Sequence, residues 1–548
     1  MTTTADAFPL PRREGALWDD LARAMLFLLA VLAVATFRDY GVSTDEGVQH
    51  LYGKHLLAFY LSGFEDWSAF YFKDLYLYGG LFDLVTAVLV RVSPFAEYET
   101  RHLLCSLIGV LGIAGCWRMA RLLGGPRAGL AAAVLLAISG VYYGAMFNNT
   151  KDVPFAAGMV WTLYYTTRIV LQLPRPKRST VLKFGLTFGL TLSIRVGAVL
   201  AAFYLAAALA LHLALAVRAV GPRVVLRDAG RTVLALLPAV PVAYAVMAVF
   251  WPWAVMSPLN PLEALRVVSR FPISIQTLFM GELVPSNDPP ALYLPVYLAV
   301  KLPEILLAGA GMALAMAGAW VMRVGPRRWP EALPYAPLVL SALLPILLFM
   351  LMRPSIYNGI RHFLFLVPSM AVAAGIAIDR LWQWAERRGT VACGAAGAAL
   401  AGLAGVYALH LVALHPNQYV YYNRFTGGVD GAAGRYELDY WGNSEHEALL
   451  ELIALVVHEN GGRPPQREYS LTVCGNTLAV NFYLPPWLKL VNGIEPDWRN
   501  PDFFMAFTQD KGCPPLIDGR TIISIGAEGT PLSIVKDRRP VGPNPLVD

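Results

Sequence analysis

Long apolar runs recur along most of this chain, and short polar turns separate them. A run of about twenty apolar residues is long enough to cross the hydrocarbon core of a bilayer as a helix. The predicted spans lie near 21–37, 101–117, 128–147, 153–170, 181–197, 198–217, 232–250, 291–321, 333–351, 362–380 and 391–413. The pattern therefore predicts a polytopic α-helical membrane protein with about eleven spans.

Composition supports this class. Of the 548 residues, 56% are hydrophobic and 15% are charged, and the mean hydropathy is +0.50. The net charge of +6 comes from basic residues clustered in loops, so it does not indicate a nucleic-acid partner. Cys105, Cys116 and Cys393 lie in apolar runs and are interpreted as small core residues, because no cysteine spacing resembles a zinc or redox motif.

The polar turns alternate in charge along the chain. By the positive-inside rule, the basic turns are cytoplasmic, together with the N-terminal segment. These turns are 117–129, 168–180, 217–231, 322–329 and 379–390. An odd number of spans then places the C-terminus outside. The run 75–92 is apolar enough to cross, but a crossing there would put every later basic turn outside. We therefore expect an interfacial helix within a first outer loop at 38–100.

The composition changes near Leu414, which predicts two domains, 1–413 in the membrane and 414–548 outside it. The stretch after Arg435 has the pattern of a loop and an amphipathic helix, and three later stretches have the pattern of strands. The last of these stretches, 521–537, has the pattern of a hairpin around Glu528-Gly529. Cys474 and Cys513 could form a disulfide in an oxidising compartment, and the sequence leaves their pairing open.

Residues suited to chemistry gather in the predicted outer loops. Carboxylates beside fixed cations fit a reaction in which a hydroxyl needs a base and a departing phosphate needs positive charge. The acids are Asp45, Glu46 and Asp152, with Lys151 and Asn149 beside the last. The candidate phosphate-binding residues are Lys73, Tyr78, Lys301, Arg353, Arg361 and His362.

Each of these residues also has a plain structural interpretation. The paired acids could be solvated, and Asp152 could complement a helix dipole. Lys301 could extend to the interface, the arginines could bind lipid headgroups, and Tyr76 and Tyr78 could belong to an aromatic belt. All of them fall on one side of the membrane in an orientation derived independently, which favours function.

Several motifs resemble a known family. They are Asp45-Glu46 after the first span, "NNTKDVPF" at 148–155, "IYNGIRHFLF" at 356–365, and the tail segment 415–448 that begins "HPNQYVYYNRFTGG". In their order along the chain and in the side of the membrane on which they fall, they resemble the GT-C membrane glycosyltransferases. The nearest branch contains the protein O-mannosyltransferases and the bacterial lipid A aminoarabinose transferases.

The resemblance implies an inverting transfer of a sugar from a polyprenyl-phosphate donor to an acceptor hydroxyl on a glycan, lipid or protein. It implies Asp45 as the base, Glu46 as its neighbour, and Asp152 as an acid that orients the acceptor or Lys151. Lys73 and Tyr78 fall where aminoarabinose transferases contact the lipid phosphate. Carboxylates could bind a divalent metal, but we expect none, because the mannosyltransferase branch does not generally depend on one.

Two other functions fit the same pattern. A transporter or flippase of a lipid-linked sugar would also carry charged residues on many helices, but it would place them near the bilayer midplane. A non-catalytic assembly protein could use the tail domain as an adaptor. We expect the enzyme, in a bacterial inner membrane, with its active site and C-terminus in the periplasm.

Overall fold

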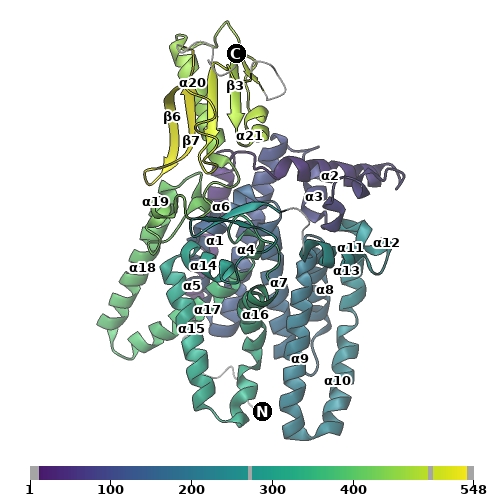
Figure 1. The fold of residues 1–548 in the computed structure, drawn as a ribbon. Helices are drawn as coiled ribbons and strands as arrows, with labels where there is room; N and C mark the ends of the chain where they lie inside the picture. The colour runs from purple at the N-terminus through teal and green to yellow at the C-terminus, as the bar shows by residue number, and fades with distance from the viewer. Residues whose placement is uncertain (1–11, 270–273, 492–497, 540–548) are drawn as a thin grey trace.

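A computed structural model describes residues 12–269, 274–491 and 498–539. It has a helical body with a small mixed sheet at one end (Figure 1). The long helices are α1 (Arg12–Thr36), α4 (Glu97–Gly124), α5 (Pro126–Ala137), α6 (Gly140–Asn148), α7 (Asp152–Leu171), α8 (Arg178–Leu192), α9 (Val199–Val220), α10 (Pro222–Leu236), α11 (Ala239–Phe250), α15 (Glu304–Arg323), α16 (Ala336–Met352), α17 (Leu366–Glu386) and α18 (Thr390–Ala413).

The helical body contains fewer clear spans than the sequence predicts. Within the described residues, six helical stretches are long and apolar enough to cross a membrane, or seven if α5 and α6 count as one broken span. Those two helices meet at 64°, because the chain bends between Ala137 and Gly140. The helical membrane class is thus confirmed, while the count of eleven is not.

The first outer loop folds into short elements. These are α2 (Glu46–Leu61), η2 (Ser68–Phe70), η3 (Leu75–Leu77) and α3 (Leu81–Leu89). The expected interfacial helix at 75–92 is therefore a 3₁₀ turn followed by nine residues of α-helix. At 1.5 Å per residue, α3 is about 13 Å long, which is too short to cross a bilayer.

Other predicted loops and spans also break into shorter elements. The segment 251–290 contains α12 (Pro252–Met256), α13 (Asn260–Ser269) and an antiparallel hairpin of β1 (Gln276–Phe279) and β2 (Glu282–Pro285), which the sequence pattern did not predict. The predicted span 291–321 is divided at Pro303 into α14 (Tyr293–Lys301) and α15. Proline ends α14 because its ring and missing N–H disrupt a continuing helix.

The main hydrophobic core lies among α1, α4, α5, α7 and α17, and it extends into the segment 419–441. Small residues let the helices approach closely, as in many membrane bundles. A Cβ on Gly375 of α17 would lie 2.7 Å from the backbone nitrogen of Ala132 in α5. The turns that join α9 to α10 and α15 to α16 belong to the predicted cytoplasmic basic turns, and they lie at the end far from the sheet (Figure 1).

Beyond α18, the chain forms the mixed sheet. After η7 (Gln418–Val420) and α19 (Gly428–Ala432) come α20 (Asn443–Glu459), β3 (Tyr469–Cys474), α21 (Thr477–Phe482), β4 (Leu488–Leu490), β5 (Phe503–Phe507), β6 (Arg520–Ala527) and β7 (Thr530–Asp537). The strand order is β4-β3-β5-β7-β6, with β3 parallel to β4 and β5, and β7 antiparallel to β5 and β6. The expected amphipathic helix, three strand segments and final hairpin are present.

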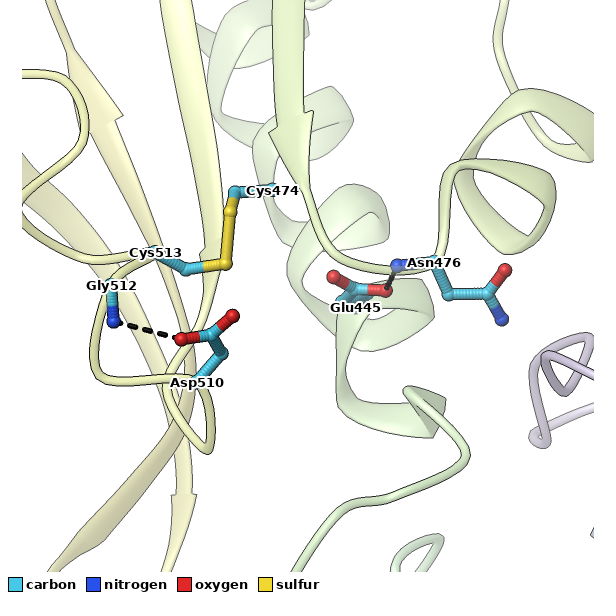
Figure 2. Close-up of a disulfide and its surroundings, with 6 residues drawn as sticks. All are labelled: Glu445, Cys474, Asn476, Asp510, Gly512 and Cys513. Carbon is cyan, nitrogen blue, oxygen red and sulfur yellow. Dashed lines mark hydrogen bonds between the residues drawn. A yellow bond between two sulfur atoms is a disulfide. The ribbon is translucent and has the colours of Figure 1, made fainter. Parts of the chain in front are cut away.

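Cys474 at the end of β3 forms a disulfide with Cys513 (Figure 2). The bond ties β3 to the loop between β5 and β6. Beside it, Glu445 of α20 accepts a hydrogen bond of 2.8 Å from the backbone N–H of Asn476. The structure thereby pairs the two cysteines whose pairing the sequence left open.

Candidate active site

Asp45 and Arg361 form an ion pair between segments that are far apart in the sequence. Asp45 is the residue before α2, and Arg361 begins the short helix η6 (Arg361–Phe363). Nη2 of Arg361 donates to Oδ2 of Asp45 at 2.7 Å. The Arg361 side chain is 6% exposed and the Asp45 side chain 39% exposed, so the guanidinium is buried and the carboxylate is accessible.

A tight turn orients Arg361. Asn358 and Gly359, with φ of 57° and 67°, both adopt the left-handed conformation that asparagine and glycine tolerate best. The Gly359 N–H donates to the Tyr293 hydroxyl at 3.2 Å, which fixes this turn on α14. The guanidinium carbon of Arg361 then lies 4.9 Å from the centre of the Tyr357 ring, a cation–π distance.

Asp152 links Arg361 to a second arginine. At the start of α7, its Oδ1 forms an ion pair with Nη2 of Arg195, and its Oδ2 lies 3.9 Å from Nε of Arg361. Oδ1 of Asn149 holds the start of α7, since it accepts from the N–H groups of Lys151 at 2.9 Å and Asp152 at 2.6 Å. The Asn149 amide also donates to Asp152. The carboxylate of Asp152 is therefore held between two guanidinium groups.

Lys151 lies over Tyr78. Its Nζ is 4.4 Å from the ring centre, and the residue is 6% exposed. Gly79 lets this loop reach the hinge before Arg195, because a Cβ there would lie 2.0 Å from the backbone of Ser193. A side chain at position 79 would separate the two segments and would move Tyr78 relative to Arg195.

The charges of this cluster follow from burial and proximity. Burial by itself would raise the pKa of the Asp45 carboxyl, but neighbouring cations, foremost Arg361, hold it below its usual value. Burial lowers the pKa of Lys151 to about 8. Burial and the charge of Arg361 lower the pKa of His362 well below its usual value. At neutral pH, Asp45 is ionised and His362 is neutral.

Glu46 belongs to a different network from Asp45. Its Oε2 accepts from the Ser43 N–H at 2.8 Å and contacts Nε2 of His102 at 3.0 Å. Nε of the fully buried Arg101 lies 3.9 Å from its Oε1, and Arg101 donates to Asp83 at 2.7 Å. The structure therefore places Glu46 in a buried ion network that joins α2, α3 and α4.

Three other predicted phosphate-binding residues lie outside the Asp45 cluster. Arg353 directly follows α16 and pairs with the exposed Asp288 at 3.2 Å. Lys301 is buried at the end of α14, where its Nζ donates to the Tyr419 carbonyl at 3.0 Å. Lys73 is exposed, in the loop before η3. Within the described residues, no hydrogen bond or ion pair joins these three to either aspartate of the cluster.

Sequence reasoning missed the roles of Arg195 and Tyr357. Arg195 is a single charge in the hinge between two predicted spans, and an isolated charge inside a long apolar stretch is a functional signal in membrane proteins. That signal could have identified Arg195. Tyr357 lies within the motif "IYNGIRHFLF", but nothing in its sequence neighbourhood indicates a contact with Arg361.

No three metal-ligating side chains gather as a binding set within the described part of the chain. Asp45 and Asp152 instead contact arginines.

Comparisons with known proteins agree with the resemblance expected from the sequence. The family model described as dolichyl-phosphate-mannose-protein mannosyltransferase matches residues 83–254, which include Lys151, Asp152 and Arg195. This match confirms the resemblance to the GT-C membrane glycosyltransferases. Asp45 and Arg361 lie outside the matched segment.

Among solved structures, ArnT from Cupriavidus metallidurans bound to undecaprenyl phosphate aligns at 15% identity with a TM-score of 0.46, over 96% of this chain and 99% of ArnT. The archaeal oligosaccharyltransferase AglB from Archaeoglobus fulgidus, in complex with an inhibitory peptide and a dolichol-phosphate, aligns at 13% identity with a TM-score of 0.45, over 89% and 69% of the two chains. No curated protein sequence matches this chain significantly.

Proposed function

We propose that this protein is an inverting glycosyltransferase of the membrane. It moves a sugar from a polyprenyl-phosphate donor to an acceptor hydroxyl on the face that carries the sheet domain. The observation that carries this proposal is a cluster of charged side chains at helix ends. Its members are Asp45, Asp152, Arg195, Arg361 and Lys151.

The charge of the cluster suits a phosphate. Two carboxylates, Asp45 and Asp152, lie among the cations Arg195, Arg361 and Lys151. Lys151 interacts with the charges of Asp83 and Asp45, but its close contact is the ring of Tyr78 and not a paired carboxylate. A donor phosphate would give this buried cation a close anionic partner, so we assign Lys151 to the phosphate as well as to acceptor orientation.

The mechanism is a single displacement. The acceptor oxygen forms a bond to the anomeric carbon of the sugar as the bond from that carbon to the phosphate oxygen breaks. The bonding electrons leave with the polyprenyl phosphate, and the hydroxyl proton passes to the carboxylate of Asp45. A low pKa keeps Asp45 ionised and ready to accept the proton, and the phosphate leaves as a stable anion without a general acid.

The other residues position these groups. Asp152 holds Arg195 and Arg361 toward one another, and Asn149 fixes Asp152 at the helix start. The neutral His362 lies 3.4 Å from Nε of Arg361 and can accept its hydrogen bond. We assign Glu46 a structural role through Arg101. Because the cluster lies at helix ends, it favours an enzyme over a transporter with charges near the midplane.

Transfer of label tests this function directly. Purified protein in lipid nanodiscs is incubated with radiolabelled polyprenyl-phosphate sugars and membrane extract. We expect the wild type to label an acceptor, and we expect Asp45→Asn to slow transfer by about a hundredfold or more while it still binds donor, because an amide cannot take the proton.

Asp39→Asn is the matched control, since Asp39 is an exposed acid close by in the sequence that contacts His415. We expect this variant to retain wild-type transfer. Movement of a labelled donor across the bilayer without labelling of any acceptor would contradict the proposal and favour the flippase. Normal turnover by Asp45→Asn would remove Asp45 from the mechanism.

A further inference from the structure

A cavity lies where the β6–β7 hairpin meets α18 and the loop before α19. Its volume is about 330 Å³, and it shares no lining residue with the Asp45 cluster. The lining residues that carry the argument are Tyr407, His410, Tyr421, Arg424, Gly428 and Glu528. Several of them belong to the tail segment "YVYYNRFTGG", which the proposed reaction does not use.

One wall of the cavity is held in place by Glu528. Its Oε2 accepts from the Val429 N–H at 2.6 Å, and its Oε1 contacts Nε2 of His410. Gly428 makes this approach possible, because its φ is +72° and a Cβ would lie 2.2 Å from Oε2 of Glu528. The wall is therefore formed before any ligand arrives, which reduces the entropic cost of binding.

The other wall is organised around Glu304 at the start of α15. Its Oε2 accepts from the Tyr407 hydroxyl at 2.5 Å, and its Oε1 accepts from the Arg424 N–H at 2.7 Å. These contacts fix the backbone of Arg424 and leave its side chain exposed at the cavity. The ring centres of His410 and Tyr421 lie 5.3 Å apart in an edge-to-face arrangement.

The chemistry of these walls suits a sugar. The partly exposed ring of Tyr407 offers a flat apolar face for the C–H side of a pyranose, and the guanidinium, imidazole and carboxylates offer donors and acceptors for its hydroxyls. About 330 Å³ is at the small end of ligand pockets and suits a ligand of one or two rings. The carboxylate of Glu528 lines the cavity and that of Glu304 holds the backbone of Arg424, so two acids stand beside the one guanidinium and the cavity does not favour an anion.

We propose that this cavity is a saccharide-binding site for an uncharged pyranose unit. The cavity lies beside the sheet domain and apart from the residues of the transfer site. This position suits a sugar of the acceptor glycan that is some distance from the reacting hydroxyl. Binding of a sugar here does not require transfer. The assignment of that sugar to the acceptor rests on the proposed function.

Saturation-transfer NMR measures the binding. The full-length protein is held in phosphocholine-lipid nanodiscs, because maltoside detergents would compete. The probes are methyl α-mannopyranoside, methyl α-glucopyranoside and methyl β-galactopyranoside, with glucose 6-phosphate as the charged comparison. We expect saturable binding of at least one neutral glycoside and weaker binding of the phosphate.

Arg424→Ala and Tyr407→Leu should each weaken the binding of that glycoside about tenfold or more. Arg435→Ala is the matched control, because Arg435 is exposed in the same segment but does not line the cavity. Arg435→Ala and Asp45→Asn should bind like the wild type. Thermal unfolding of each variant shows whether it is folded, and Arg424→Ala retains the backbone contact with Glu304.

Several results would overturn the proposal. One is that no neutral glycoside shows saturable binding, and another is that Arg424→Ala and Arg435→Ala bind the glycoside equally well. The others are that Asp45→Asn loses glycoside binding, and that the protein prefers glucose 6-phosphate to the neutral glycosides. In the transfer assay, Arg424→Ala should raise the KM for the acceptor and leave the KM for the donor unchanged. A rise in the donor KM alone would overturn the assignment to the acceptor.

Discussion

At the scale of single residues, the cluster separates two acids that are neighbours in the sequence. Asp45 contacts Arg361, whereas Glu46 contacts Ser43 and His102. The start of α2 lies between them, so their side chains leave the backbone in different directions. One acid is therefore partly open and suited to chemistry, while the other is buried in an ion network.

Arg361→Lys tests the geometry of the phosphate site. A guanidinium can contact Asp45, Asp152 and a phosphate together, whereas an ammonium cannot copy this planar arrangement. We expect kcat/KM for the donor to fall by about tenfold to a hundredfold, which corresponds to about 1.5–3 kcal/mol for a hydrogen bond to a charged group. Steady-state kinetics with varied donor measures this loss.

Arg266→Lys is the control for this substitution, since Arg266 is an exposed arginine of α13 on the same face. It should behave like the wild type. If the two variants had equally small effects, Arg361 would serve as a structural anchor, and the phosphate site would have to be sought elsewhere.

The lowered pKa of Lys151 predicts that donor binding depends on pH. Burial lowers its pKa to about 8, so the ammonium is present below that pH and is lost as the pH rises through it. We expect donor affinity to fall about tenfold between pH 7 and pH 9. Lys151→Arg should remove this fall, because arginine stays charged throughout the range.

Titration of donor binding by the purified protein from pH 6 to pH 10 measures this effect. Lys54→Arg, at an exposed lysine of α2 that pairs with Glu97, should retain the wild-type profile. An unchanged profile in Lys151→Arg would show that another group controls the pH dependence.

At the scale of elements, the site depends on short segments at helix ends. The first outer loop packs on the hinge between α8 and η4 (Val196–Ala198), where the Leu81 N–H donates to the Ser193 carbonyl at 3.0 Å and Gly79 allows the contact. The turn at Asn358-Gly359 orients η6. Backbone contacts between loops thus set the positions of Tyr78, Arg195 and Arg361.

The disulfide is the element-scale feature most easily removed. Cys474 and Cys513 are 39 residues apart, and closing a loop of this length stabilises a fold by about 3–4 kcal/mol in the chain-entropy treatment. We expect the double variant Cys474→Ser/Cys513→Ser to lower the free energy of unfolding of the sheet domain by about this amount. Proteolysis in increasing urea measures it.

Cys393→Ser is the matched control, because Cys393 is a free cysteine of α18. It should unfold like the wild type. Identical urea profiles for the double variant and the wild type would show that the bond contributes little to the stability of the domain.

At the scale of the whole molecule, the sheet domain and α2, which Asp45 precedes, lie at one end of the helical body, and the α9–α10 and α15–α16 turns lie at the other (Figure 1). The two basic turns thus lie on one side, and their assignment to the cytoplasm stays a prediction. The disulfide also suits an oxidising compartment for the sheet domain.

Reporter fusions test this orientation. A reporter that is active only in the periplasm should be active when fused after Asp548 and inactive when fused after Gly389, in the basic turn between α17 and α18. The second fusion is the control for the first. Reversed activities would invert the orientation and would place the proposed site in the cytoplasm.

The sequence by itself determined the features that depend on local pattern. Hydropathy identified the helical membrane class, and periodicity identified α20 and the strands β3, β5, β6 and β7. These elements form from neighbouring residues, so a short window contains enough information. Hydropathy did not predict the bend between α5 and α6 or the break at Pro303, and the predicted number of spans is not confirmed.

Only the tertiary structure decided which residues meet. Asp45 and Arg361 are separated by 316 positions, and no local pattern specifies that pair. The ion pair of Asp152 with Arg195, the separation of Arg353 from Arg361, and the pairing of Cys474 with Cys513 depend in the same way on how the helices and loops pack. The sequence therefore supplied the charged residues, and the packing of the chain determined which of them could share one site.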